Sequence, residues 1–426
     1  MQSLLALSVA LLSGLFLSRL AKRLGLPAVT AYLVAGVLIG PYVLGALGIE
    51  GLGFISHADV KYYGIISDVA LGFIAFSIGN EFRLAQLKEI GKQATAIGIL
   101  QAVVATLAVD AALIILHFIF PHVLPLPTAI VLGAIASATA PAATLMVVRQ
   151  YKAKGPVTDM LLPVVALDDA VGLVLFAISF GVAKALLSGV VDVVSIIVEP
   201  LLEVALSLLL GFLMGMAFTF AERFFHSRSK RLSMSVAFVL LTVGVSMMSW
   251  QFEIGGHTIH IAFSSLLSCM MLGTVFCNLC DFSEELMDRL DRWTGPLFIL
   301  FFVLSGAELE LSVFKSGAVV LIGIVYILTR SIGKCVGAFS SAKLTHSHPN
   351  VIKYLGITLL PQAGVALGMA IKAETLGDAG MMVANITLLA VLVYELIGPL
   401  LTKVALLKAG EIKPEERKSV RGEAIK

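Results

Sequence analysis

The segment from residue 161 to residue 176 reads Leu161-Leu-Pro-Val-Val-Ala-Leu-Asp-Asp-Ala-Val-Gly-Leu-Val-Leu-Phe176, an apolar run with two adjacent aspartates at its centre. A charged side chain at the centre of a bilayer costs roughly 2.5–3.5 kcal/mol on insertion scales. Consecutive helical residues point ~100° apart, so one aspartate can face a water-filled cavity while the other faces protein. We therefore predict that Asp168 and Asp169 bind and release an ion. The structural alternative is a static network that neutralises both of them.

The composition is that of a membrane protein. Of 426 residues, 58% are hydrophobic and 14% are charged, whereas soluble domains have roughly 45–50% apolar and about 25% charged residues. This difference excludes a soluble enzyme of this length. The net charge of +2 gives no indication of a nucleic-acid partner. The chain also has no phosphate-binding glycine loop, nucleophile elbow or metal-type His pair, so we expect no enzyme activity, no catalytic residue and no cofactor.

Thirteen apolar stretches have about the 18–25 residues that a bilayer core requires. Basic residues follow the first of them instead of preceding it, so we interpret it as a spanning helix and not as a signal peptide. The sequence therefore predicts an all-α polytopic membrane protein with thirteen transmembrane helices. The expected spans lie near residues 2–20, 28–47, 62–82, 93–117, 126–148, 158–183, 200–221, 231–250, 259–279, 294–312, 316–340, 351–372 and 379–404.

The placement of lysine and arginine predicts the orientation. If alternate loops face the cytoplasm, beginning after the first span, most of the 30 basic residues fall on the cytoplasmic side. The positive-inside bias then places the N-terminus outside and the C-terminus in the cytoplasm of a multi-pass protein of the cell membrane. We expect a membrane domain at residues 1–405 and a short, disordered cytoplasmic tail at residues 406–426. The opposite side receives only Lys61, Lys184, Lys315 and Lys372.

Three landmarks recur in the same order in the two halves of the chain, which indicates an internal repeat at about residues 27–186 and 257–405. The repeat interval is seven spans. Because this number is odd, the two halves must be inverted in the membrane. Coincidence among apolar helices of low complexity is the alternative. The matched residues are Gly79 with Gly306, Glu81 with Glu308, Leu84 with Leu311, Lys88 with Lys315, Pro141 with Pro361, Asp169 with Glu395 and Gly172 with Gly398.

Two prolines mark the expected helix breaks. Pro141 lies in the fifth span and Pro361 in the twelfth. A proline inside a helix removes a backbone donor, and the freed carbonyls can line a cavity. Inverted repeats with two crossing broken helices are a transporter architecture in which the ion binds near the crossing. We expect Ser137, Pro141, Pro361 and Gln362 at this crossing and Thr139 at the ion; an ordinary proline kink is the alternative at each break.

Two basic residues, Arg330 and Lys334, lie in the eleventh span on one helix face. Two acids and two bases in the same part of the membrane suggest ion pairs, which lower the cost of burial. We therefore assign Arg330 and Lys334 to charge compensation, with snorkelling to the interface as the alternative. Glu395 is deep in the last span, where we expect a supporting structural role.

Several stretches resemble the cation:proton antiporter-2 family, the sodium/proton and potassium/proton exchangers of the NapA and Kef type. The resemblance covers nearly the whole membrane part. It implies a homodimer in which an inverted-repeat core moves against a dimerisation domain. The matching stretches are Leu26-Pro-Ala-Val-Thr-Ala-Tyr-Leu-Val-Ala-Gly-Val-Leu-Ile-Gly-Pro41, Leu304-Ser-Gly-Ala-Glu308, Arg330-Ser-Ile-Gly-Lys334, Leu359-Leu-Pro-Gln-Ala-Gly-Val-Ala366 and Glu395-Leu-Ile-Gly-Pro399.

The resemblance also implies individual roles. Asp169 matches the aspartate that takes up cation and proton, and Asp168 matches the preceding acid of charge-moving members. Lys334 matches the lysine that pairs with an aspartate in those members. Arg330 matches an arginine of electroneutral exchangers, but Val164 stands where those exchangers have a glutamate. On balance the resemblance favours the charge-moving class.

The sequence thus predicts a secondary antiporter that exchanges protons for a monovalent cation by alternating access. Na⁺ is favoured and K⁺ is possible; no other metal is expected. The alternatives are a Kef-like potassium efflux protein regulated by a separate subunit and a non-transport membrane bundle. An intramembrane aspartyl protease would need its two aspartates on separate helices. The expected partners are Na⁺ or K⁺, H⁺, membrane lipid and a second copy of the chain.

Overall fold

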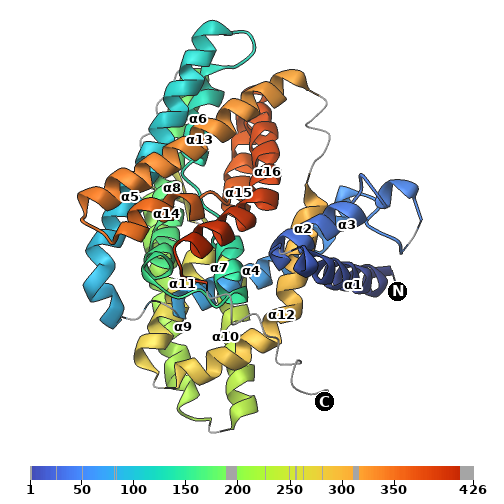
Figure 1. Cartoon of the computed structure of the whole chain (residues 1–426), viewed down its shortest axis with the longest axis vertical. Helices are drawn as coiled ribbons and strands as arrows, with labels where there is room; N and C mark the ends of the chain where they lie inside the picture. The colour runs from blue at the N-terminus through green and yellow to red at the C-terminus, as the bar shows by residue number, and fades with distance from the viewer. Residues whose placement is uncertain are drawn as a thin grey trace.

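The structure is a computed structural model that describes residues 2–24, 26–49, 51–80, 82, 84–188, 199–225, 227–248, 250–254, 257–261, 263–280, 282–309 and 316–412. Its chain is almost entirely helical (Figure 1). The elements are α1 (Gln2–Arg23), α2 (Ala28–Ile39), η1 (Gly45–Leu47), α3 (His57–Tyr62), α4 (Gly64–Asn80), α5 (Leu84–Ile119), α6 (Leu126–Ile135), α7 (Pro141–Gln150), α8 (Pro156–Ser188), α9 (Glu199–Glu222), α10 (Arg228–Ser246), β1 (Trp250–Ile254), β2 (His257–Ile261), α11 (Ser265–Leu279), α12 (Ser283–Glu308), α13 (Gly317–Leu344), α14 (Pro349–Thr358), α15 (Gly364–Ala373), η4 (Glu374–Leu376) and α16 (Asp378–Lys408).

The predicted all-α membrane fold is confirmed. Within the described residues, seven helices are long and apolar enough to cross a membrane: α1, α5, α8, α9, α10, α13 and α16. Shorter apolar helices are α2, α4, α6 and α11. Helices satisfy their own backbone hydrogen bonds, which the bilayer core requires. The total of thirteen spans stays a prediction, although every predicted stretch contains a helix or a pair of half-helices.

A short hairpin replaces helix between α10 and α11. Strands β1 and β2 pair antiparallel from Trp250 with Ile261 to Ile254 with His257. The expected spans 231–250 and 259–279 are therefore too long, because α10 ends at Ser246 and α11 begins at Ser265. Polar and apolar residues alternate along 250–254, and two glycines follow. This pattern is typical of a β-hairpin.

Both expected breaks are present, and each separates two short helices. In the first half, α6 ends at Ile135 and α7 begins at Pro141, whose missing N–H suits the first position of a helix. In the second half, α14 ends at Thr358 and α15 begins at Gly364, with Pro361 in the extended connection. The breaks place non-helical backbone inside the protein, where neighbouring helices can satisfy it.

Glycines lie at equivalent helix crossings in the two halves of the repeat. Helix α2 crosses α12 at Gly36 and Gly306, and α4 crosses α11 at Gly79 and Gly273. A Cβ atom on any of these four would overlap a backbone carbonyl oxygen of the opposite helix. Under the repeat, α2 corresponds to α11 and α12 to α4, so the two crossings are equivalent. Small residues allow such close approach of membrane helices.

A second pair of glycines brings the breaks against the long helices of their own halves. A Cβ atom on Gly172 of α8 would lie 3.1 Å from the Ser137 hydroxyl oxygen, in the first break. A Cβ atom on Gly398 of α16 would lie 2.9 Å from the ring of Pro361, in the second break. These glycines follow Asp169 and Glu395 in the repeated motif, so their recurrence has a packing reason.

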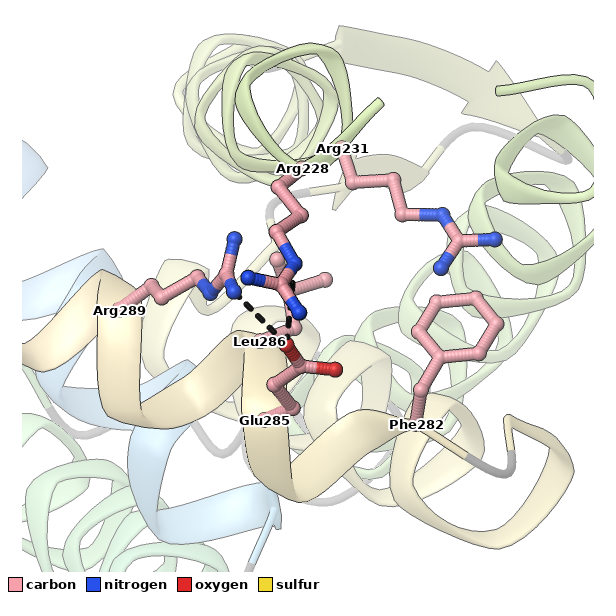
Figure 2. Close-up of a pocket in the computed structure, with 6 residues that line it drawn as sticks. All are labelled: Arg228, Arg231, Phe282, Glu285, Leu286 and Arg289. Atoms are coloured by element: carbon pink, nitrogen blue, oxygen red, sulfur yellow. Dashed lines mark hydrogen bonds and ion pairs between the residues drawn. The ribbon is translucent and has the colours of Figure 1, made fainter. Parts of the chain in front are cut away.

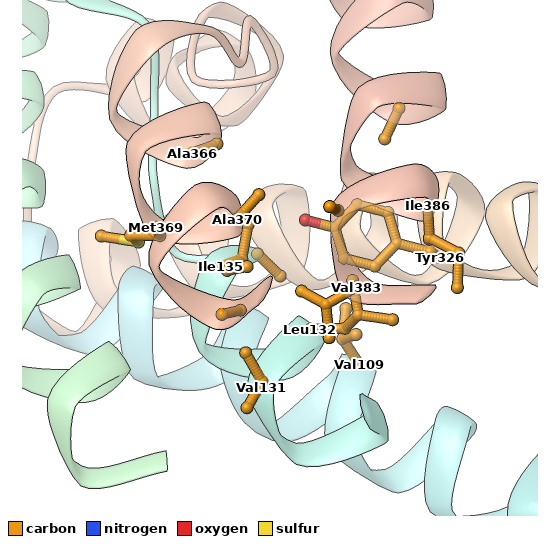
Figure 3. Close-up of a cluster of buried hydrophobic side chains, with 14 of the residues drawn as sticks. Val109, Val131, Leu132, Ile135, Tyr326, Ala366, Met369, Ala370, Val383 and Ile386 are labelled. Atoms are coloured by element: carbon orange, nitrogen blue, oxygen red, sulfur yellow. The ribbon is translucent and has the colours of Figure 1, made fainter. Parts of the chain in front are cut away.

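Buried apolar side chains form two large clusters, and each cluster is shared by a different set of helices. Helices α5, α6, α8, α13, α15 and α16 share one cluster, in which the Tyr326 ring lies among aliphatic side chains (Figure 3). Helices α2, α4, α7, α9, α10, α11 and α12 share the other, which includes the stacked rings of Phe218 and Phe276. Helix α1 packs on α2 and α12 at the periphery. The two breaks contribute to both clusters and therefore lie where the parts meet.

The first residues after α16 are packed against the protein. Both carboxylate oxygens of Glu411 accept hydrogen bonds from the first turn of α8, from the Val157 and Thr158 amides at 2.6 and 2.8 Å. Acceptors at a helix N-terminus satisfy donors that the helix itself leaves unpaired. Of the expected tail, residues 413–426 lie outside the described part of the chain.

Candidate ion-binding site

The two helix breaks touch at their extended segments. The Ala140 amide donates to the Pro361 carbonyl at 2.8 Å. The Gln362 side-chain amide donates to the Ile135 carbonyl at 2.9 Å. The structure therefore brings Ser137, Thr139, Pro141, Pro361 and Gln362 to one crossing, deep between α5, α8, α13 and α16.

Arg330 joins the two breaks. Its guanidinium donates to the carbonyls of Ala136 and Ala138 in the first break at 3.0 and 2.6 Å, and to Leu360 in the second at 2.7 Å. It is fully buried and lies 4.5 Å from the centre of the Tyr394 ring. These carbonyls follow the C-terminal ends of α6 and α14, where a cation is favourable. The planar fork of donors in arginine suits three acceptors at once.

Lys334 lies one turn farther along α13 and pairs with Asp168. Its ammonium is 3.0 Å from Oδ2 of Asp168, and both side chains have no exposed surface. It also donates to the Thr139 hydroxyl at 2.9 Å and to the Ser137 carbonyl. A buried pair persists only when further hydrogen bonds satisfy both groups. The ammonium thus holds the first break and the acid of α8 together.

The carboxylate of Asp168 is held on both oxygens. Oδ2 accepts from the Thr139 hydroxyl at 2.6 Å as well as from Lys334. Oδ1 accepts from the side-chain amide of Gln101, a buried residue of α5. Asp168 is therefore connected to α5, to α13 and to the first break by hydrogen bonds, and a change at this carboxylate acts on all three.

Asp169 follows on the same helix, and its backbone is in α8. Its side chain, like the whole of Glu81, lies outside the described part of the structure. The role that the sequence predicts for Asp169 therefore stays a prediction. On a helix it points ~100° away from Asp168.

Glu395 is buried in α16, with 4% of its surface exposed. Its Oε2 has no hydrogen-bond partner among the described residues. The preceding Tyr394 is better connected, since its hydroxyl donates to the Ile327 carbonyl at 2.7 Å and contacts the Ser331 hydroxyl at 2.8 Å. The contact between α16 and Arg330 is thus made by the Tyr394 ring.

The sequence argument missed three residues of this site. Gln101 binds Asp168, Tyr326 bonds to Gln362 at 3.0 Å, and Tyr394 lies against Arg330. Gln101 had a usable signal, because a lone amide in the apolar run of α5 needs a polar partner inside the membrane. The two tyrosines had no such signal, because the local sequence does not indicate which group a tyrosine ring or hydroxyl will contact.

Comparison with known proteins identifies the family. Residues 7–408 match the family described as "Sodium/hydrogen exchanger, transmembrane". The chain belongs to this family. Its members are multi-pass membrane transporters that exchange cations for protons, and are not enzymes. The match names this broader family and not the narrower cation:proton antiporter-2 group.

Two solved structures of one archaeal protein share the fold. The sodium proton antiporter MjNhaP1 from Methanocaldococcus jannaschii at pH 8 superposes with a TM-score of 0.66 at 19% identity, covering 96% of this chain and 99% of that one. An electron-microscopy structure of the same antiporter gives a TM-score of 0.69 at 16% identity, covering 95% and 94%. At these identities the likeness establishes the antiporter fold alone.

Proposed function

We propose that this protein exchanges Na⁺ for protons by alternating access, with Asp169 and Asp168 as the carboxylates for which cation and proton compete. The observation that carries the proposal is the fully buried cluster of Asp168, Thr139 and Lys334 at the crossing of two broken helices. Inverted-repeat transporters bind their ions at such a crossing. The family supports cation:proton exchange in general.

The cluster offers oxygen ligands of the kind that Na⁺ takes. These are the carboxylates of α8, the Thr139 hydroxyl and the carbonyls of the breaks. In the described arrangement, Lys334 and Arg330 supply the positive charge that these oxygens require. A cation that reaches Asp168 and Asp169 therefore competes with the Lys334 ammonium for the same oxygens, which links cation binding to loss of a proton.

The burial of the site supports alternating access. Asp168, Lys334 and Arg330 have no exposed surface, and Thr139 has 2%. Ions can reach these groups only if the parts of the molecule move relative to one another. We assign the moving part to the cluster shared by α5, α6, α8, α13, α15 and α16, whose helices carry Asp168, Arg330 and Lys334, and we expect a homodimer to hold the other part fixed. Membership of the narrower cation:proton antiporter-2 group stays a prediction.

Proton release from proteoliposomes tests the function. Purified protein is reconstituted with a pH-sensitive dye inside the vesicles, and Na⁺, Li⁺ or K⁺ is added outside. Na⁺ should change the internal pH most strongly. A response to K⁺ alone would favour the potassium-exchanging alternative, and no response to any of the three ions would contradict antiport.

A variant of Asp169 tests the assignment of the ion-binding carboxylate. Asp169→Asn should abolish the response while the protein remains folded and monodisperse in detergent. Asp378→Asn is the matched control, because Asp378 is exposed at the start of α16 and should leave exchange unchanged. Normal exchange by Asp169→Asn would show that the cation binds elsewhere.

A further inference from the structure

A pocket lies far from the crossing, where the first turn of α10 meets the beginning of α12 (Figure 2). Both α9, which ends at Glu222, and α10 are apolar helices that can cross a membrane. The pocket therefore lies at a membrane boundary, on the side that the distribution of basic residues predicts to be cytoplasmic. It is lined by Arg228, Arg231, Phe282, Glu285, Leu286 and Arg289.

One carboxylate holds two of the three arginines together. Oε1 of Glu285 lies 2.7 Å from Arg289 and 3.5 Å from Arg228. A guanidinium has five N–H donors, and one carboxylate has only two oxygens. Glu285 thus brings two guanidiniums to one place and leaves donors on both for a second anion.

Arg231 is held rigidly at the opposite wall. Its guanidinium lies 3.7 Å from the centre of the Phe282 ring, and its Nε donates to the Phe225 carbonyl at 2.6 Å. The buried Glu222 is 3.5 Å from the same nitrogen. These contacts fix the position of the Arg231 guanidinium at this wall of the pocket. Even with Glu222 counted, three arginines and two glutamates leave the pocket with a net positive charge.

We propose that this pocket binds a phosphate group through Arg228, Arg231 and Arg289. Guanidiniums match the oxygens of phosphate in pairs, and three of them around one cavity are more specific than a diffuse basic surface. At a membrane boundary the phosphate can belong to an anionic lipid headgroup. A free phosphate ion has the same chemistry, and the experiment separates the two sources.

The test titrates the full-length protein in a neutral detergent at constant ionic strength. The probes are dioctanoyl-phosphatidylglycerol, dioctanoyl-phosphatidylcholine and sodium phosphate, and the readout is the melting temperature. We expect the anionic lipid to stabilise the protein at concentrations where phosphatidylcholine does not. Stabilisation by sodium phosphate at the same concentrations would assign the pocket to free phosphate.

Three variants connect the effect to the pocket. Arg228→Gln should weaken binding about fivefold, since an arginine near an anionic surface contributes to binding by that factor. Its side chain is 78% exposed, so its replacement should leave folding intact. Glu285→Gln should strengthen binding, because the glutamine oxygen can still accept hydrogen bonds from the two arginines while the competing negative charge is removed. Lys230→Gln is the control: it removes an exposed charge from the same turn without lining the pocket.

Arg228→Gln should weaken lipid binding and Glu285→Gln should strengthen it, and these opposite effects distinguish a specific pocket from general surface charge. A proposal based on surface charge alone predicts equal losses for Arg228→Gln and Lys230→Gln. Equal losses in these two variants, or no gain in Glu285→Gln, would overturn the pocket as a phosphate site. If none of the probes stabilises the wild-type protein, the proposal also fails.

Discussion

The ammonium of Lys334 lies 3.0 Å from Oδ2 of Asp168, and neither side chain has any exposed surface. The pair connects α13 with α8, and through Thr139 it also holds the first helix break. A buried charge pair is tolerated only while both partners are present and hydrogen-bonded. The stability of the fold and the chemistry of the site therefore depend on the same contact.

Removal of one member of this ion pair should destabilise the protein more than removal of both. Asp168→Ala leaves the Lys334 ammonium buried without its carboxylate, which should lower the free energy of unfolding by about 3–5 kcal/mol. Asp168→Ala combined with Lys334→Met should recover most of this loss, although exchange should be absent. Melting temperatures of the two variants in detergent check the order; a double variant no more stable than Asp168→Ala would contradict the coupling.

Arg330 should not tolerate replacement by lysine. A single ammonium cannot reach the carbonyls of Ala136, Ala138 and Leu360 together, so at least one buried carbonyl loses its partner, at about 1–3 kcal/mol. Arg330→Lys should therefore melt at a lower temperature and exchange more slowly. Arg223→Lys, at an exposed position, is the control. Wild-type stability in Arg330→Lys would mean that the three bonds do not hold the breaks.

Much of the architecture could be predicted because membrane burial makes sequence signals strong. Apolar length locates the helices, and Pro141 and Pro361 lie at the two breaks. However, Pro163, Pro296 and Pro399 lie inside continuous helices, so that proline alone does not identify a break. The charged residues Asp168, Arg330 and Lys334 were also identifiable, since the bilayer core tolerates charge only where it is needed.

The partners of these residues could not be predicted. Arg330 was expected in an ion pair, yet its described bonds go to backbone carbonyls, which have no sequence signature. The cap that Glu411 forms on α8 joins residues more than 250 positions apart, and helical periodicity carries no information at that range. Local patterns indicate which groups are buried, and tertiary packing decides which of them meet.

Cysteine accessibility should report the opening of the site. Thr139 and Gln362 are 2% and 0% exposed, so labelling of Thr139→Cys and Gln362→Cys by a water-soluble maleimide requires the crossing to open. We expect labelling that accelerates while ions are exchanged, in a background without the four native cysteines. Exposed Thr375→Cys should be labelled at once, and Val109→Cys, inside an apolar cluster, should stay protected. Full protection at both break positions from both sides of the membrane would contradict a site that opens to water.

The last prediction concerns the charge that each cycle moves. Because the Lys334 ammonium and an incoming cation compete for the oxygens of Asp168 and Thr139, cation binding should favour loss of the lysine proton. One proton from Asp169 and one from Lys334 would then exchange for one cation, so a membrane potential should accelerate transport. Lysine suits this role because its ammonium can lose a proton when buried, whereas arginine stays charged.

Lys334→Arg should therefore weaken the dependence on potential or stop transport. The measurement compares Na⁺-driven proton movement in proteoliposomes with and without a potassium diffusion potential set by valinomycin. Lys343→Arg, in the last turn of the same helix, is the control and should respond to the potential as the wild type does. Equal rates for the wild type with and without the potential would show that Lys334 has a structural role and that exchange is electroneutral.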